Sequence, residues 1–225
     1  MLELENVTKL FSKEKGVYEV TLDVNRGEVI ALVGPNGTGK STLIKMIVGI
    51  LDLDNGCISM DGIVAGCDEY KGQIGYLPEK IIINGQIRAY DLIRMVSICK
   101  YNVFLQEEIE KAIDAYKLRD NIWEKMSNLS LGMQKKIGLI IAFMGNPKVI
   151  VLDEPTNGLD TSGIIQLKEN IEIATRNGTS VIISSHILDF VGAVCDRCVF
   201  LKDTKIAKVI EQGSDLERIY KELYL

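Results

Sequence analysis

Short apolar runs recur along the chain, and three of them end abruptly in polar residues. These runs cover residues 29–33, 149–152 and 180–184 and are rich in Val, Ile and Leu. Runs of this length without strict alternation are typical of strands that are buried on both faces of a parallel sheet. Because ligand chemistry gathers at the carboxyl ends of such strands, we expect the three polar ends to meet at one site.

Alternating and helical spacings predict the other elements. Residues 1–33 alternate apolar and polar positions and are interrupted at Gly16 and Gly27, which indicates short strands leading into the run at 29–33. Further strands are predicted at 57–62, 74–79, 198–201 and 205–210, and helices at 41–48, 137–144 and 163–175. The capping-box sequence Ser214-Asp215-Leu216-Glu217 predicts the start of a last helix.

The pattern is mainly helical from residue 87 to about residue 118, between strand-rich stretches. We therefore predict an α/β core formed by residues 1–80 and 146–225, with a helical lobe, residues 81–145, inserted into it. Within the lobe, residues 129–134 open a strongly apolar helix, and Ser130 is a natural N-cap for that helix.

Composition is that of one globular domain, because 225 residues with 47% hydrophobic and 25% charged side chains can bury a real core. The net charge of −5 argues against a protein that grips nucleic acid over a broad surface, since such binding depends on Lys and Arg. We therefore expect no nucleic-acid partner. No apolar run approaches the ~20 residues that span a bilayer.

Five cysteines cannot all pair within one chain, and the acidic start of the sequence does not resemble a secretory signal. We therefore expect reduced thiols and a cytoplasmic location. Cys195 and Cys198 form a lone Cys-x-x-Cys, which lacks the two further ligands that a structural zinc would need. A metal or redox role for this pair is the less favoured interpretation.

A phosphate-binding motif, Gly-x-x-x-x-Gly-Lys-Ser, lies between the strand at 29–33 and the helix at 41–48. Glycines allow several backbone N–H groups to approach one anion, and the positive end of the following helix points at the same place. Lys40 would supply charge to the β and γ phosphates, and the Ser41 hydroxyl would ligate Mg²⁺. The residues of this nucleotide-binding loop are Gly34, Pro35, Asn36, Gly37, Thr38, Gly39, Lys40, Ser41 and Thr42.

Two carboxylates and the single histidine follow the other two apolar runs. Asp153 is expected to face Mg²⁺, while Glu154 would orient or deprotonate the attacking water. The alternative for an acidic pair before a proline is a solvated turn. His186 is expected to hydrogen-bond the γ-phosphate, although a lone histidine is more often structural.

An aromatic residue upstream of the phosphate-binding loop could stack on the nucleotide base. Phe11 is the first candidate and Tyr18 is its competitor. For both residues, packing against a sheet is about as good an explanation.

Taken together, these residues resemble the nucleotide-binding subunit of ATP-binding cassette (ABC) transporters. Residues 34–42 are similar to the Walker A motif, 149–154 to Walker B, 129–133 to the family signature, and 157–160 to the D-loop, with His186 as the switch histidine. The resemblance implies a P-loop NTPase with a RecA-like core, an antiparallel β subdomain and an inserted helical subdomain, and it implies ATP and Mg²⁺ as cofactors.

The resemblance also implies how the chain works. Two such subunits, in a homodimer or a heterodimer, would sandwich two ATP molecules, with Ser130 and Gly132 of one subunit contacting the γ-phosphate held by Lys40 of the other. The subunit would hydrolyse ATP and power export through a separate permease, on the inner face of the cell membrane. Coupling to the permease would pass through residues 76–85 and the helical lobe.

The chain departs from the family pattern at two places. The signature reads Leu-Ser-Leu-Gly-Met, with Leu131 and Met133 in place of Gly and Gln. Glu79 stands where the family often has the Q-loop glutamine; a carboxylate could still hold Mg²⁺ but cannot donate a hydrogen bond. These variants resemble the bacterial multidrug, antibiotic and bacteriocin-immunity exporters. The alternatives are a soluble ABC-type ATPase that acts on ribosomes or DNA, and a nucleotide-binding module with little turnover.

Overall fold

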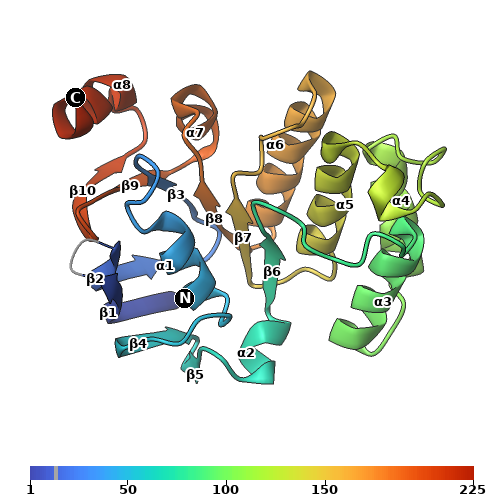
Figure 1. Cartoon of the computed structure of the whole chain (residues 1–225), viewed down its shortest axis with the longest axis horizontal. Coiled ribbons are helices and arrows are strands. Elements are labelled where there is room, and N and C mark those ends of the chain that lie inside the picture. Colours follow the sequence, from blue (N-terminus) through green and yellow to red (C-terminus); the bar gives the residue numbers. More distant parts are fainter. Residues whose placement is uncertain (13–14) are drawn as a thin grey trace.

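The computed structural model describes residues 1–12 and 15–225, which form two β-sheets with helices packed around them (Figure 1). The strands are β1 (Leu2–Ser12), β2 (Lys15–Val24), β3 (Val29–Val33), β4 (Asn55–Met60), β5 (Ile63–Val64), β6 (Ile74–Leu77), β7 (Val149–Asp153), β8 (Ser180–Ser184), β9 (Arg197–Lys202) and β10 (Lys205–Glu211). The helices are α1 (Lys40–Ile47), α2 (Asp68–Gly72), α3 (Ala89–Tyr101), α4 (Gln106–Ala115), α5 (Leu131–Phe143), α6 (Thr161–Arg176), α7 (Leu188–Val194) and α8 (Leu216–Tyr224), with a 3₁₀ turn at Met126–Asn128.

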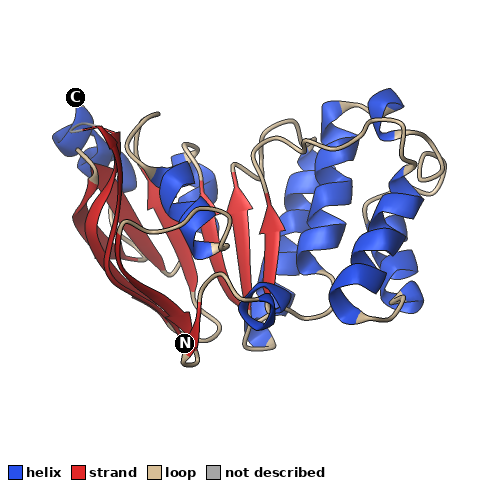
Figure 2. Cartoon of the chain, turned by 60° about the horizontal axis from the view of Figure 1, so that its bottom comes forward, coloured by secondary structure: helices blue, strands red, loops and turns tan. Residues whose placement is uncertain are grey.

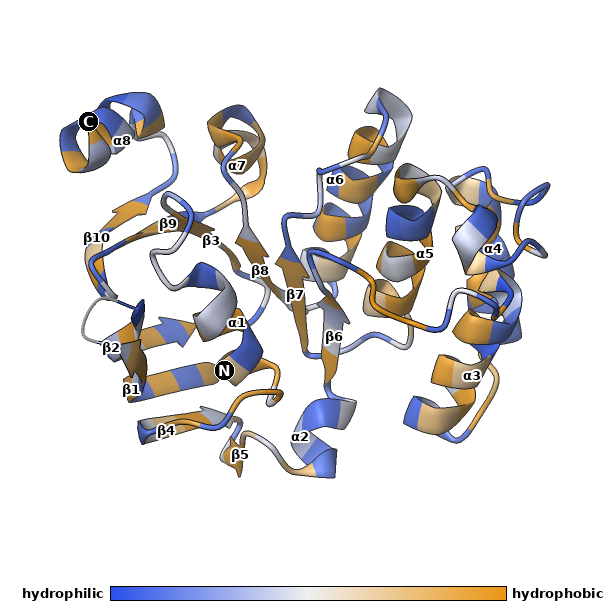
Figure 3. Cartoon of the chain, viewed as in Figure 1, coloured by the Kyte–Doolittle hydropathy of each residue, from blue (hydrophilic) through white to orange (hydrophobic). Residues whose placement is uncertain are grey.

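The larger sheet has six strands in the order β10-β9-β3-β8-β7-β6. β6, β7, β8, β3 and β9 are parallel, and only β10 runs antiparallel to its neighbour. Every residue of β3, β7 and β8 is buried, and Figure 3 shows β7 and β8 as mainly apolar strands. The three apolar runs in the sequence are therefore strands covered on both faces, as predicted.

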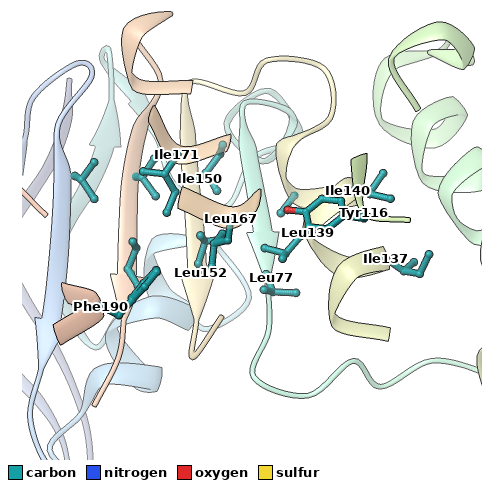
Figure 4. Packing of buried hydrophobic residues seen from close by; sticks show 14 of the residues in the cluster. Leu77, Tyr116, Ile137, Leu139, Ile140, Ile150, Leu152, Leu167, Ile171 and Phe190 are labelled. Carbon is teal, nitrogen blue, oxygen red and sulfur yellow. The ribbon is translucent and has the colours of Figure 1, made fainter. Parts of the chain in front are cut away.

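Side chains alternate between two cores on the opposite faces of this sheet. On one face, Ile30 and Leu32 of β3 pack with α1 and the smaller sheet. On the other face, β7 packs against α6 and α7, as Figure 4 shows for Ile150, Leu152 and Phe190. Each fully buried Leu or Ile contributes about 1.5–3 kcal/mol relative to exposure, so these two layers fix the sheet and hence the ends of its strands.

The smaller sheet is antiparallel, in the order β2-β1-β4-β5. The expectation of short strands leading into β3 was wrong: β1 and β2 are 11 and 10 residues long, pair with each other, and belong to a separate sheet from β3. The physical reason lies in their alternating burial, which suits a sheet with one covered face, whereas β3 is buried on both faces. This sheet is the antiparallel β subdomain that the resemblance implies.

Helices α3, α4 and α5 lie between β6 and β7 in the chain and gather at one end of the molecule (Figure 2). Ser130 is the N-cap of α5, as predicted, because its Oγ accepts a hydrogen bond from the backbone N–H of Met133 at 3.2 Å. The capping box was misplaced by one residue: α8 is capped by Asp215, whose Oδ1 accepts from the N–H of Arg218 at 3.0 Å. A carboxylate is as good an N-cap as a hydroxyl, so the later residue can serve.

Helix α5 packs on the edge strand β6 at backbone distance. A Cβ at Gly75 would lie 1.8 Å from the carbonyl oxygen of Ala142, so only glycine allows this approach. Figure 4 shows Leu77 of β6 and Leu139 of α5 in the shared core. This contact joins the helical stretch to the sheet. The division into a core of residues 1–80 and 146–225 and a lobe of residues 81–145 stays a prediction.

Candidate functional site

The carboxyl ends of β3, β7 and β8 open into a cavity of about 920 Å³. It brings together the predicted candidates from segments that are far apart in the sequence. The lining residues that were predicted are Phe11, Gly34, Pro35, Asn36, Gly37, Thr38, Gly39, Lys40, Ser41, Thr42, Glu79, Asp153, Glu154 and His186.

The phosphate-binding loop joins β3 to α1. Gly39 has a φ of 104° and a Cβ there would lie 2.4 Å from the carbonyl oxygen of Gly16, so this position requires glycine. Gly39 offers no side-chain cap to α1, and the first N–H groups of the helix are therefore free for an anion. Helix α1 begins at Lys40, one residue before the predicted start.

Lys40 is buried, and its ammonium group folds back onto the loop. Nζ donates to the carbonyl oxygens of Gly34 at 2.6 Å and Pro35 at 3.0 Å. Burial lowers the pKa of Lys40, while the nearby charges of Glu154, Asp153 and Glu79 raise it. A bound phosphate would replace the two carbonyl oxygens as the hydrogen-bond partner of Lys40 and would lie close to the three carboxylates.

Asp153 is the last residue of β7, Glu154 follows it, and both are buried. The Ser184 hydroxyl on the neighbouring strand β8 donates to Oδ1 of Asp153. Glu154 has a φ of 47°, in the left-handed region, and its N–H donates to Oγ of Ser184 at 3.0 Å. Buried acids held by hydrogen bonds do not fit the alternative of a solvated turn.

His186 follows β8 and faces Glu154. Its Nδ1 lies 2.8 Å from Oε2 of Glu154, and the side chain is 59% exposed. The exposed part of the ring lines the cavity, where a γ-phosphate could reach it. The arrangement pairs a carboxylate that can take a proton from water with an imidazole that can hydrogen-bond a phosphate.

The oxygen donors of the cavity suit Mg²⁺, which prefers carboxylate, hydroxyl, water and phosphate ligands. Ser41, Glu79 and Asp153 all line the cavity. Within residues 1–12 and 15–225, no three His, Cys, Asp or Glu residues are close enough to form a metal site of their own. This donor set fits an ion that arrives with a nucleotide and takes part of its coordination from phosphate and water.

Phe11 and Tyr18 are separated by the structure. Phe11 is 61% exposed and lines the cavity. Tyr18 packs elsewhere, with Nζ of Lys205 lying 4.7 Å from its ring centroid. Of the two candidates, Phe11 is the one that lines the cavity, and its stacking on the base stays a prediction.

Several lining residues were not predicted as site residues, although one of them, Asn157, lies in the D-loop-like segment 157–160. They come from the start of β2, the segment after β7, the β9–β10 turn and α8. These residues are Lys15, Gly16, Asn157, Asp203, Thr204 and Tyr220. The pairing of the β9–β10 hairpin and the docking of α8 bring Asp203, Thr204 and Tyr220 to the cavity. Neither contact can be predicted from local sequence spacing.

Ser130 and Gly132 do not line this cavity. Instead, the N-terminus of α5 packs on the segment after β7: a Cβ at Gly132 would lie 2.4 Å from the carbonyl oxygen of Gly158. Lys136 adds an ion pair with Asp160 at 3.2 Å. The signature-like and D-loop-like segments of one chain therefore form one unit, with Leu131 63% exposed on it.

The Cys-x-x-Cys pair contributes to the core. Cys195 and Cys198 are both free and buried, and burial raises the pKa of both thiols, that of Cys198 to about 11. Thiols that resist ionisation are poor nucleophiles and poor metal ligands.

Among the helices of residues 1–12 and 15–225, none is both long enough and apolar enough to cross a membrane.

Comparison with known proteins shows the family of the chain. Residues 17–157 match the family model described as ABC transporter. The chain is 32% identical over 224 residues to the lantibiotic transport ATP-binding protein SrtF of Streptococcus pyogenes, covering 100% of this chain and 96% of that protein. It is 31% identical over 202 residues to the linearmycin resistance ATP-binding protein LnrL of Bacillus subtilis, covering 88% of this chain and 65% of that protein.

A solved structure described as the ATP-binding subunit of an ABC transporter superposes with a TM-score of 0.91 at 28% identity, covering 99% of both chains. The chain is thus an α/β P-loop ATPase with ATP and Mg²⁺ as its cofactors. The chain belongs to the ABC transporter family, as an ATP-binding cassette.

Proposed function

We propose that this chain is the ATP-hydrolysing subunit of an exporter and that it powers a separate membrane permease. The observation that carries the proposal is the convergence of Lys40, Asp153, Glu154 and His186 on one cavity. This set speaks against a nucleotide-binding module with little turnover. Export is supported by the similarity to a lantibiotic transport protein and a linearmycin resistance protein.

In the proposed mechanism, Lys40 exchanges its carbonyl partners for phosphate oxygens, and the N–H groups at the start of α1 bind the same anion. Ser41, Asp153 and Glu79 would hold Mg²⁺, which spreads the negative charge of the phosphates when it is bound. Glu154 accepts a proton from the attacking water. His186 contacts Glu154 and hydrogen-bonds the γ-phosphate, which positions the two groups relative to each other.

The dimer partner is proposed from the exposed end of α5. Ser130 and Gly132 lie outside the cavity of their own chain, at a helix N-terminus that attracts anions. A second cassette, identical or different, would place its ATP there. ATP would then close the dimer, and hydrolysis would release it.

The permease contact is proposed at the segment after β6 and the neighbouring helical stretch. Ile82 is 90% exposed, and Met95, Val103 and Trp123 are also exposed apolar side chains. An apolar surface of this kind fits docking to another protein.

Cell fractionation tests the proposal against action on ribosomes or DNA. The tagged chain should sediment with membrane vesicles and be released by an alkaline wash, as expected of a peripheral protein on the inner face. Ile82→Asp should reduce this association, whereas Ile173→Asp, a matched change of an exposed residue on α6, should not. Sedimentation with ribosomes, or no membrane association, would contradict the proposed function.

A further inference from the structure

Lys135 is a buried lysine next to the ATP site. It lies in α5 and is only 2% exposed. Lysine is rarely buried this deeply without a specific arrangement of partners. The expected mechanism gives it no role.

The ammonium group of Lys135 joins three segments of the chain. Nζ donates to the carbonyl oxygens of Glu79 at 2.9 Å, Pro78 at 3.3 Å and Asp153 at 3.4 Å. The first two belong to the loop after β6 and the third to the end of β7, while Lys135 itself is carried by α5. Two of these carbonyls belong to residues whose side chains line the cavity.

The charges around Lys135 are those of the ATP site. Its partners are backbone carbonyls, and in residues 1–12 and 15–225 no carboxylate forms an ion pair with Nζ. Burial lowers the pKa of Lys135, and the charges of Asp153, Glu79 and Glu154 raise it. Two buried lysines, Lys135 on α5 and Lys40 on the phosphate-binding loop, thus lie near the same three acids.

We propose that Lys135 is a positioning residue of the ATP site, which ties the Glu79 loop to the end of β7 and offsets the extra negative charge that Glu79 brings. The inference rests on the proposed hydrolytic site.

The negative charge of Glu79 is the reason that Lys135 and Glu79 are treated as a pair. Where the family often has a neutral glutamine, this chain has a carboxylate beside Asp153 and Glu154. Unpaired like charges would repel one another and the phosphates of ATP. A buried ammonium group on the backbone of the same loop reduces that repulsion without occupying the cavity.

The test measures the metal preference of nucleotide binding, defined as the Kd for ATPγS in EDTA divided by the Kd in Mg²⁺. Lys135→Gln removes a positive charge, which weakens the binding of metal-free ATPγS more than that of its less negative Mg²⁺ complex. The ratio should therefore rise by roughly threefold or more. Glu79→Gln removes a negative charge and should lower the ratio by a similar factor.

The double variant is the decisive arm, because its net charge equals that of the wild-type protein. Its metal preference should return to within about twofold of the wild-type ratio if the two charges act on the same site. Lys135→Met provides a second, neutral replacement that keeps the apolar stem, and it should raise the ratio as Lys135→Gln does.

Lys100→Gln is the matched control. Lys100 also lies in the helical stretch, and its Nζ donates to the carbonyl oxygen of Ile74 at 2.6 Å, at the other end of β6. This variant should leave the metal preference unchanged even if it melts at a lower temperature.

Unchanged ratios in both Lys135 variants, or a double variant no closer to the wild-type ratio than Lys135→Gln, would overturn the inference. A wild-type protein that binds no ATPγS at all would instead overturn the proposed function.

Discussion

Glu154 adopts a backbone conformation that glutamate rarely takes. Its φ of 47° costs about 1–3 kcal/mol unless the surroundings hold it in place. Ser184 does so, because its carbonyl and hydroxyl oxygens both accept the N–H of Glu154, at 3.2 and 3.0 Å. This turn takes Glu154 out of the line of β7, and its carboxylate reaches His186.

Replacing Glu154 by Gln tests its role in hydrolysis. Glutamine has nearly the same shape but cannot take a proton from water, so ATP binding should persist. Steady-state hydrolysis should slow by at least about tenfold, or about 1.4 kcal/mol of barrier. Glu19→Gln is the control, since Glu19 is also a glutamate with positive φ but does not line the cavity. An undiminished rate for Glu154→Gln would remove the carboxylate from the proposed chemistry.

Residues with a motif could be predicted from the sequence, and residues without one could not. Lys40, Asp153 and His186 each follow a buried strand, so topology alone brings them together. Lys135 gives no such signal, because a lysine in an apolar helix is expected to reach the solvent. Only the packing of α5 on β6 shows that its ammonium group is enclosed.

At the scale of elements, continuous apolar runs were the most reliable guide. β3, β7 and β8 were predicted because strands buried on both faces need no alternation. Alternation in β1 and β2 identified strands but not their sheet, since pairing depends on contacts far apart in the sequence. The antiparallel sheet came from family resemblance.

The junction of α3 and β6 gives a prediction about pH. Nζ of Lys100 donates a hydrogen bond to the carbonyl oxygen of Ile74, and burial lowers the pKa of Lys100 to about 8. Between pH 8 and the ordinary value of 10.5, the unfolded chain binds a proton at Lys100 that the folded chain releases. Stability from this group therefore rises with pH across that interval.

Urea unfolding of the wild-type protein and of Lys100→Met measures this effect. The free energy of unfolding of the wild-type protein, relative to the variant, should increase from pH 8 to pH 10.5. Lys111→Met, which changes an exposed lysine on α4, should show no such trend. A wild-type advantage that falls with rising pH would show that burial does not control Lys100.

At the scale of the whole molecule, the two groups of residues proposed to contact ATP lie apart on one chain. The cavity holds Lys40 and Glu154, whereas Ser130 and Gly132 lie on the exposed end of α5, fixed to the segment after β7. This separation supports a site that two subunits complete together. The sequence could suggest it only through resemblance, because no spacing reports a contact between chains.

Mixing two inactive variants tests whether the sites are shared. Ser130→Ala and Lys40→Ala should each be nearly inactive alone. An equimolar mixture should regain about a quarter of the wild-type rate, because about half of the dimers are mixed and each of these has one complete site.

A mixture of Lys40→Ala with Glu154→Gln is the control. Both of these residues belong to the same chain's half of a site, so no mixed dimer has a complete site and no activity should return. Failure of the Ser130→Ala mixture to regain activity at any ratio would count against a site built by two chains.

The most direct measurement is the mass of the Glu154→Gln protein by light scattering, with and without Mg²⁺ and ATP. The variant retains ATP, so the monomer of 25.0 kDa should double in mass when both ligands are present and remain a monomer in EDTA. A monomer at every ATP concentration, in protein that demonstrably binds ATP, would contradict closure of two cassettes around the nucleotide.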